Sequence, residues 1–97
     1  MIIGLLTIQI DIPHWETVKE RRNLIRSIKD KIRKKFNVSV SEIVEEDHFG
    51  QKTIIAVSAV SNETDHLNSV LSNVYNLVER FHPDIIHSYS TNFIVHE

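Results

Sequence analysis

The order in which the hydrophobic patterns change period is the feature that most constrains the fold. Apolar residues recur every three or four positions in residues 17–36 and 62–81, which is the period of one buried helix face. Runs rich in β-branched residues precede, separate and follow these two segments, at residues 2–10, 38–44, 52–60 and 85–95. The sequence therefore predicts the element order β-α-β-β-α-β.

This order restricts the chain to a few topologies. Each helix joins two strands that must run parallel, and right-handed crossovers place both helices on one face of the sheet. We therefore expect an α+β ferredoxin-like sandwich of two layers, with an antiparallel four-stranded sheet. The 97 residues predict a single domain over residues 1–97, because two domains would not fit in this length.

Local signals predict where the elements begin and end. Thr17 and Glu20 have the spacing of a capping box, so the first helix begins there. Asn37 is expected to end this helix in the left-handed conformation, and residues 45–50 are expected to form a hairpin turn with positive φ at Gly50. The apolar stripe of the first helix is predicted to consist of Val18, Ile25, Ile28, Ile32 and Phe36.

Charge is distributed unevenly along the chain. Residues 17–36 hold nine of the eleven lysines and arginines against two acidic residues, a net charge of +7. The remainder holds two basic residues against eleven acidic ones, a net charge of −9. Segregation of this kind is informative about partners rather than about the fold.

A row of cations follows one side of the first helix. At 100° per residue, five basic side chains fall within about 80° of one another over roughly 20 Å of helix. They are Lys19, Arg22, Arg26, Lys29 and Arg33, and Lys34 with Lys35 is expected to add charge at the far end. This row predicts contact with the phosphates of RNA or the ribosome. One alternative is a solvated helix face with no ligand. The other is a homo-oligomeric protein-interaction module with no nucleic-acid role, in which these cations pair with an acidic protein surface.

The uncovered face of the sheet is the second candidate surface. Neither face of strands 2–10 and 52–60 is strongly polar, and an exposed apolar face usually marks an interface. We therefore expect a homodimer or a partner protein on this face, with an interface formed by Ile3, Leu5, Tyr89 and Phe93. The alternative is that chain ends or loops cover it. These two strands hold no aromatic residue, which argues against base stacking of the RRM type.

The residues for catalysis or metal binding are missing. The chain has no cysteine, and its six histidines show no i, i+3 or i, i+4 pair. Two glycines cannot build a phosphate loop, and residues 11–16 lack the glycine-rich loop and arginine of an acylphosphatase. We expect no catalytic residue, no metal, no cofactor and no enzymatic activity. For Glu45–His48 we favour a solvated turn over a cation site, and for Trp15 a packing role over an interface role.

The sequence also predicts a cellular location. No apolar stretch approaches the length that spans a membrane. A signal peptide has basic residues before its apolar region, and none precedes the apolar run at residues 1–6. Together with the absence of cysteine, this predicts a cytoplasmic protein without membrane contact.

Several segments resemble the YlxP-like family of small bacterial proteins. Residues 17–22, Thr-Val-Lys-Glu-Arg-Arg, match the family pattern Ser-Leu-Lys-Glu-Lys-Arg. Residues 36–42, Phe-Asn-Val-Ser-Val-Ser-Glu, match Phe-Asn-Val-Ser-Val-Ala-Glu, and residues 25–29 and 56–61 also fit. At residues 47–51 the chain departs from the family's Asp-Leu-Trp-Gln. The resemblance implies a ferredoxin-like fold without a settled activity. It also implies a role in translation or ribosome maturation, because genes of the family often neighbour those of an initiation factor and a ribosome-binding factor.

Overall fold

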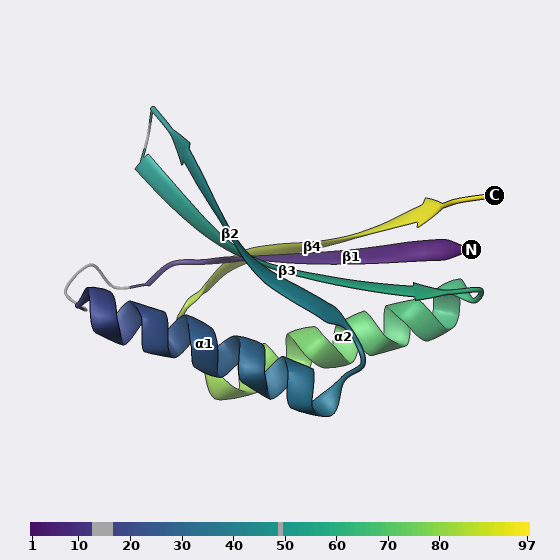
Figure 1. The fold of residues 1–97 in the computed structure, drawn as a ribbon, viewed down its shortest axis with the longest axis horizontal. Coiled ribbons are helices and arrows are strands. Elements are labelled where there is room, and N and C mark those ends of the chain that lie inside the picture. The colour runs from purple at the N-terminus through teal and green to yellow at the C-terminus, as the bar shows by residue number, and fades with distance from the viewer. Residues whose placement is uncertain (13–16, 49) are drawn as a thin grey trace.

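The computed structural model describes residues 1–12, 17–48 and 50–97, so the prediction for Trp15 lies outside the described residues. The elements are β1 (Ile2–Ile10), α1 (Val18–Lys35), β2 (Ser39–Asp47), β3 (Gly50–Ser61), α2 (Thr64–Phe81) and β4 (Ile86–Val95). Both helices lie on one side of the sheet (Figure 1). The predicted element order and two-layer ferredoxin-like sandwich are therefore confirmed.

The sheet has the strand order β2-β3-β1-β4, and all neighbouring strands are antiparallel. From Gly4 to Ile10 the even-numbered residues of β1 are buried beneath the helices, whereas the odd-numbered residues of β1 are half-buried on the open face. Residues directly opposite one another on neighbouring strands share a face, so the register carries this division across the sheet. Gly4 allows α2 to approach closely, because a Cβ at this position would lie 2.9 Å from Cδ1 of Leu71.

The core lies between the helix layer and the sheet. Its fully buried side chains come from both helices and both central strands, and include Leu6, Ile8, Ile28, Ile32, Ile55, Val57, Leu71 and Val74. The predicted stripe of α1 is confirmed at Ile25, Ile28 and Ile32, but it is wrong at Val18, which is 67% exposed. Val18 stands in the first turn of α1, at the rim of a hollow rather than over the core.

The hairpin between β2 and β3 is longer than predicted. Glu45 and Glu46 belong to β2, so the prediction of a turn over residues 45–50 is wrong at these positions. Lys52 lies opposite Glu45, and Nε2 of Gln51 donates to Oε1 of Glu46 at 3.3 Å. Opposite charges and a side-chain hydrogen bond across the strands favour continued pairing.

Two backbone predictions have different outcomes. Gly50 has a φ of +121°, so the predicted positive φ is confirmed. The left-handed conformation predicted for Asn37 is wrong, because no non-glycine residue in the described ranges has a positive φ. Helix α1 ends instead where Phe36 becomes extended, with φ −128° and ψ 143°, while its N–H still donates to the carbonyl of Ile32.

His82 follows the last residue of α2 and makes stability depend on pH. Burial, and secondarily the charge of Lys31, lowers the pKa of His82 below 6.5. Below pH 6.5 the unfolded chain therefore binds a proton more readily than the native protein, so the free energy of unfolding falls as the pH decreases. We expect His82→Gln to reduce this fall between pH 7 and pH 5, as measured by urea unfolding. Identical pH dependence in both proteins would contradict the assignment.

Candidate nucleic-acid interface

Hydrogen bonds hold helix α1 at both ends of the segment that carries its predicted cations. At the start, the Oγ1 of Thr17 accepts a hydrogen bond from the backbone N–H of Glu20 at 3.1 Å, as the capping signal predicts. Near the end, the guanidinium of Arg33 donates to the carbonyl of Val40 in β2 at 3.0 Å. The cap sets where the helix begins, and the contact with β2 holds its last turns against the sheet.

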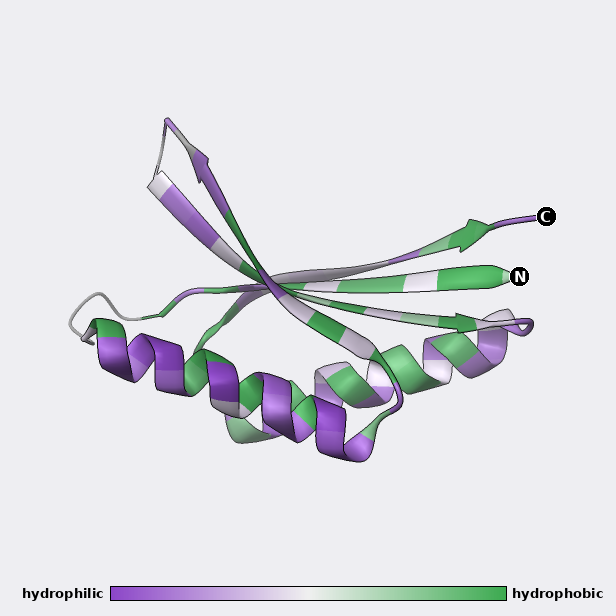
Figure 2. Ribbon diagram, viewed as in Figure 1, coloured by the Kyte–Doolittle hydropathy of each residue, from purple (hydrophilic) through white to green (hydrophobic). Residues whose placement is uncertain are grey.

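The five predicted cations lie in a row along α1, beside the apolar face that packs on the core. We call Lys19, Arg22, Arg26, Lys29 and Arg33 the basic stripe. Four of them are exposed and Lys29 is half-buried. Along the ribbon of α1, hydrophilic stretches predominate and hydrophobic ones recur between them (Figure 2). The stripe therefore presents charge to the solvent, although Arg33 also uses one of its donors within the protein.

Lys34 and Lys35 do not continue the basic stripe. At 100° per residue they lie about 100° and 200° further round the helix than Arg33. Lys35 lines a hollow of about 370 Å³ between the two helices, together with Asn73 and Arg80 of α2. Both lysines lie in the last turn of α1 and add charge at that end of the helix, as the sequence predicts, and their contact with phosphates stays a prediction.

A hollow of about 360 Å³ lies between the N-terminal half of the basic stripe and the hairpin. Arg21 and Arg22 line it from the helix, and Glu42, Gln51 and Thr53 line it from the strands. The guanidinium of Arg21 donates to the Oγ1 of Thr53 at 3.2 Å, which gives this buried hydroxyl a partner. Arg21 is thus a structural residue, whereas Arg22 has no hydrogen bond from its side chain among the residues that the structure describes.

Acidic residues limit the positive charge of this surface. Glu42 lies in the same hollow as Arg22. Asp30 stands one helical turn after Arg26, at the i, i+4 spacing at which side chains are neighbours. These two carboxylates therefore lower the positive charge that an anionic ligand meets near Arg22 and Arg26.

The open face of the sheet contains only part of the predicted interface. Ile3 and Leu5 lie on this face, as expected. Tyr89 lies opposite Ile8 and Phe93 opposite Gly4, so both belong to the face that the helices cover. Their predicted placement on the open face is wrong. The register of β4 against β1 decides on which face these two side chains lie, and the sequence of β4 alone does not reveal that register.

The open face is also more polar than the sequence suggests. Ser41, Ala56, Thr7 and Ser90 follow one another across the four strands, and the hydroxyls of Thr7 and Ser90 share a hydrogen bond of 2.9 Å. This row separates the apolar residues at one end of the face from those at the other. The face is therefore not one continuous apolar patch.

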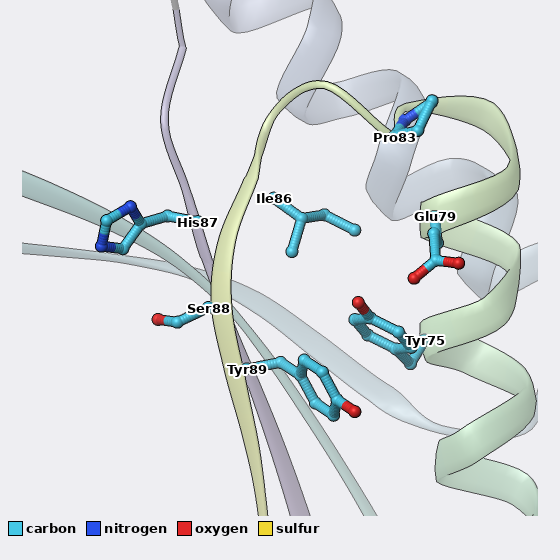
Figure 3. A pocket seen from close by; sticks show the side chains of 7 residues that line it. All are labelled: Tyr75, Glu79, Pro83, Ile86, His87, Ser88 and Tyr89. Atoms are coloured by element: carbon cyan, nitrogen blue, oxygen red, sulfur yellow. The ribbon is translucent and has the colours of Figure 1, made fainter.

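A hollow of about 560 Å³ lies between α2 and the start of β4 and was not predicted from the sequence. The rings of Tyr75 and Tyr89 stack there with centroids 3.9 Å apart (Figure 3). A hydrogen bond to the Glu79 carboxylate, with burial, raises the pKa of Tyr75. At its edge the pairing of β4 shifts at His87, so that the side chains of His87 and Ser88 both point away from α2 (Figure 3). A bulge of this kind leaves no trace in the sequence.

In the described ranges, no three His, Asp or Glu side chains are grouped as a metal ion would require. Neither helix in these ranges is long and apolar enough to cross a membrane.

Solved structures define the class of fold. A Dabb family protein from Mesorhizobium loti with a ferredoxin-like fold superposes with a TM-score of 0.61 at 9% identity, covering 99% of this chain and 97% of that one. A dimeric protein of unknown function from Bacteroides fragilis, also ferredoxin-like, gives 0.55 at 8% identity, covering 98% and 96%. The protein is therefore of the ferredoxin-like class.

Sequence comparison places the chain within this class. The family described as "Protein of unknown function (DUF503)" matches residues 3–91, and the chain belongs to this family. The uncharacterized protein YlxP of Bacillus subtilis is 31% identical over 84 residues, which cover 87% of this chain and 89% of that protein. The predicted membership of the YlxP-like family is confirmed.

Proposed function

We propose that this domain is a non-enzymatic RNA-binding protein of the cytoplasm that contacts phosphates through the basic stripe of α1. The observation that carries the proposal is the segregation of charge, with +7 on residues 17–36 of a chain whose net charge is −2. Solvated helices usually mix both signs of charge, whereas a row of cations on an acidic protein is typical of a surface that binds a polyanion.

The dimensions of the basic stripe suit a phosphate backbone. From Lys19 to Arg33 the stripe runs about 21 Å along α1, at 1.5 Å per residue. Each phosphate contact releases condensed counterions, so cations in a row add affinity without reading a base sequence. The stripe therefore supports binding to structured RNA through its backbone.

The sheet gives no support for an alternative way of binding RNA. Domains of the RRM type stack bases on aromatic residues of their two central strands. The corresponding strands β1 and β3 contain no Phe, Tyr or Trp.

We propose ribosomal RNA as the ligand, because the resemblance to YlxP-like proteins implies a role in translation or ribosome maturation.

A salt titration tests the proposal. Fluorescence anisotropy of labelled ribosomal RNA fragments would measure the affinity of the protein at a series of salt concentrations. About five phosphate contacts give a slope near −4 in a plot of log K against log salt concentration. A lack of binding at the lowest salt concentration would overturn the proposal.

A further inference from the structure

The two edges of the sheet differ in the protection that their strands carry. β2 forms one edge and bears Glu42, Glu45 and Glu46, and charges on an edge strand discourage pairing with another chain. β4 forms the other edge, and its ten residues, IHSYSTNFIV, include no Lys, Arg, Asp, Glu or Pro. β4 is therefore a long edge without the usual protection against pairing.

The hydrogen bonds of the last residues show which backbone groups of β4 face outward. The N–H of His96 donates to the carbonyl of Met1 at 2.8 Å, and the N-terminus of Met1 donates to the carbonyl of His96 at 3.1 Å. In an antiparallel pair, hydrogen-bonded positions alternate with positions whose N–H and C=O point away from the partner. The outward groups therefore belong to Tyr89, Thr91, Phe93 and Val95.

The same four residues place their side chains on the helix face, where the helices leave β4 partly uncovered. Tyr89 is 55% exposed, Phe93 is 37% exposed and Val95 is 68% exposed. Free backbone groups and exposed apolar side chains thus coincide along one strand. Addition of another strand satisfies both at once, because it pairs the backbone and covers the side chains.

We propose that two copies of this chain pair through β4, antiparallel about a two-fold axis at Thr91, to form a continuous eight-stranded sheet. With Thr91 opposite its counterpart, Tyr89 lies opposite Phe93 of the second copy, and Phe93 lies opposite Tyr89. Aromatic pairs across antiparallel strands stabilise sheets. This dimer uses a surface distinct from the basic stripe and does not depend on RNA binding.

A second copy suits this edge better than a foreign strand does. A two-fold interface requires a self-complementary surface, in which residue i meets j and j meets i. β4 meets this condition because it holds no Lys, Arg, Asp or Glu, so two copies of it can pair without placing like charges opposite each other. The second copy would also bring Phe93 and Val95 beside Tyr89 and His87, at the open side of the hollow that Tyr75 lines.

One substitution separates the edge dimer from a dimer through the open face. Thr91→Pro removes an outward N–H and leaves the hydrogen bonds between β4 and β1 in place, since proline is tolerated at such edge positions. Sedimentation equilibrium should show a dimer for the native protein and a monomer for Thr91→Pro, with unchanged circular dichroism. Leu5→Lys, which places a charge on the open face, should remain dimeric. A native monomer, or a dimer that survives Thr91→Pro and is lost in Leu5→Lys, would overturn the proposal.

A cross-link tests the register independently of proline. The chain has no cysteine, so Thr91→Cys introduces a single thiol. Hydrogen-bonded antiparallel partners have Cα atoms about 5.5 Å apart, which is within the range that a disulfide spans. Mild oxidation should link Thr91→Cys into a dimer, whereas Ser41→Cys on β2 should stay monomeric in a denaturing gel. Equal cross-linking of both variants, or none at Thr91→Cys, would contradict this arrangement.

Discussion

The double variant Arg22→Glu with Arg26→Glu is expected to bind ribosomal RNA at least about 60-fold more weakly than the native protein at 0.1 M salt. Each phosphate contact contributes about 0.9 to the slope of log K against log salt, so the loss of two contacts costs about 1.8 log units between 1 M and 0.1 M. Repulsion by the new carboxylates weakens binding further. The magnitude of the slope should fall by about 1.8.

The matched control reverses the same number of charges elsewhere. Lys52→Glu with Arg80→Glu changes the net charge equally, and these are the two basic residues outside residues 17–36. Both side chains are exposed, and circular dichroism would check that the fold survives the loss of the opposite charges of Lys52 and Glu45. The control should keep most of the affinity. Similar losses in the two double variants would indicate a general charge effect and would contradict a role for the basic stripe.

Replacement of Ile28 by alanine is expected to lower the free energy of unfolding by about 3 kcal/mol, within the usual range for such truncations. Ile28 is 1% exposed and lies in the middle of the face of α1 that packs on the core. The truncation removes apolar contacts and leaves a cavity under the helix that carries the basic stripe. Urea unfolding followed by circular dichroism measures the change, as a lower midpoint at an unchanged slope.

Val18→Ala is the control for this variant, because the periodicity of the sequence assigns both residues to one apolar stripe. Val18 is 67% exposed, so its truncation should change the free energy of unfolding by less than about 0.5 kcal/mol. A cost as large as that of Ile28→Ala would mean that the N-terminal turn of α1 packs differently from the structure described above.

The sequence predicts those features that depend on local periodicity. The element order, the buried face of α1 and the relative positions of its five aligned cations all follow from 3.6 residues per turn. The same geometry places Lys34 and Lys35 in the last turn of α1, to one side of the line of the basic stripe. The positive φ of Gly50 follows from its lack of a Cβ.

Features that depend on long-range pairing could not be predicted. The face on which Tyr89 and Phe93 lie is set by the register of β4 against β1 and by the shift at His87. The contact between Arg21 and Thr53 joins residues 32 positions apart, and no periodicity in either segment indicates it. The exposure of Val18 likewise depends on where the hairpin lies relative to the first turn of α1.

The most direct test of the basic stripe is to map RNA contacts on the protein by NMR. Unlabelled ribosomal RNA would be added to the ¹⁵N-labelled domain until anisotropy shows saturation. We predict that the amide signals of α1 around Lys19, Arg22 and Arg26 shift, while those of Thr91 and its neighbours in β4 do not. Saturated binding that leaves the signals of α1 unchanged and shifts those of the open sheet face would contradict the account.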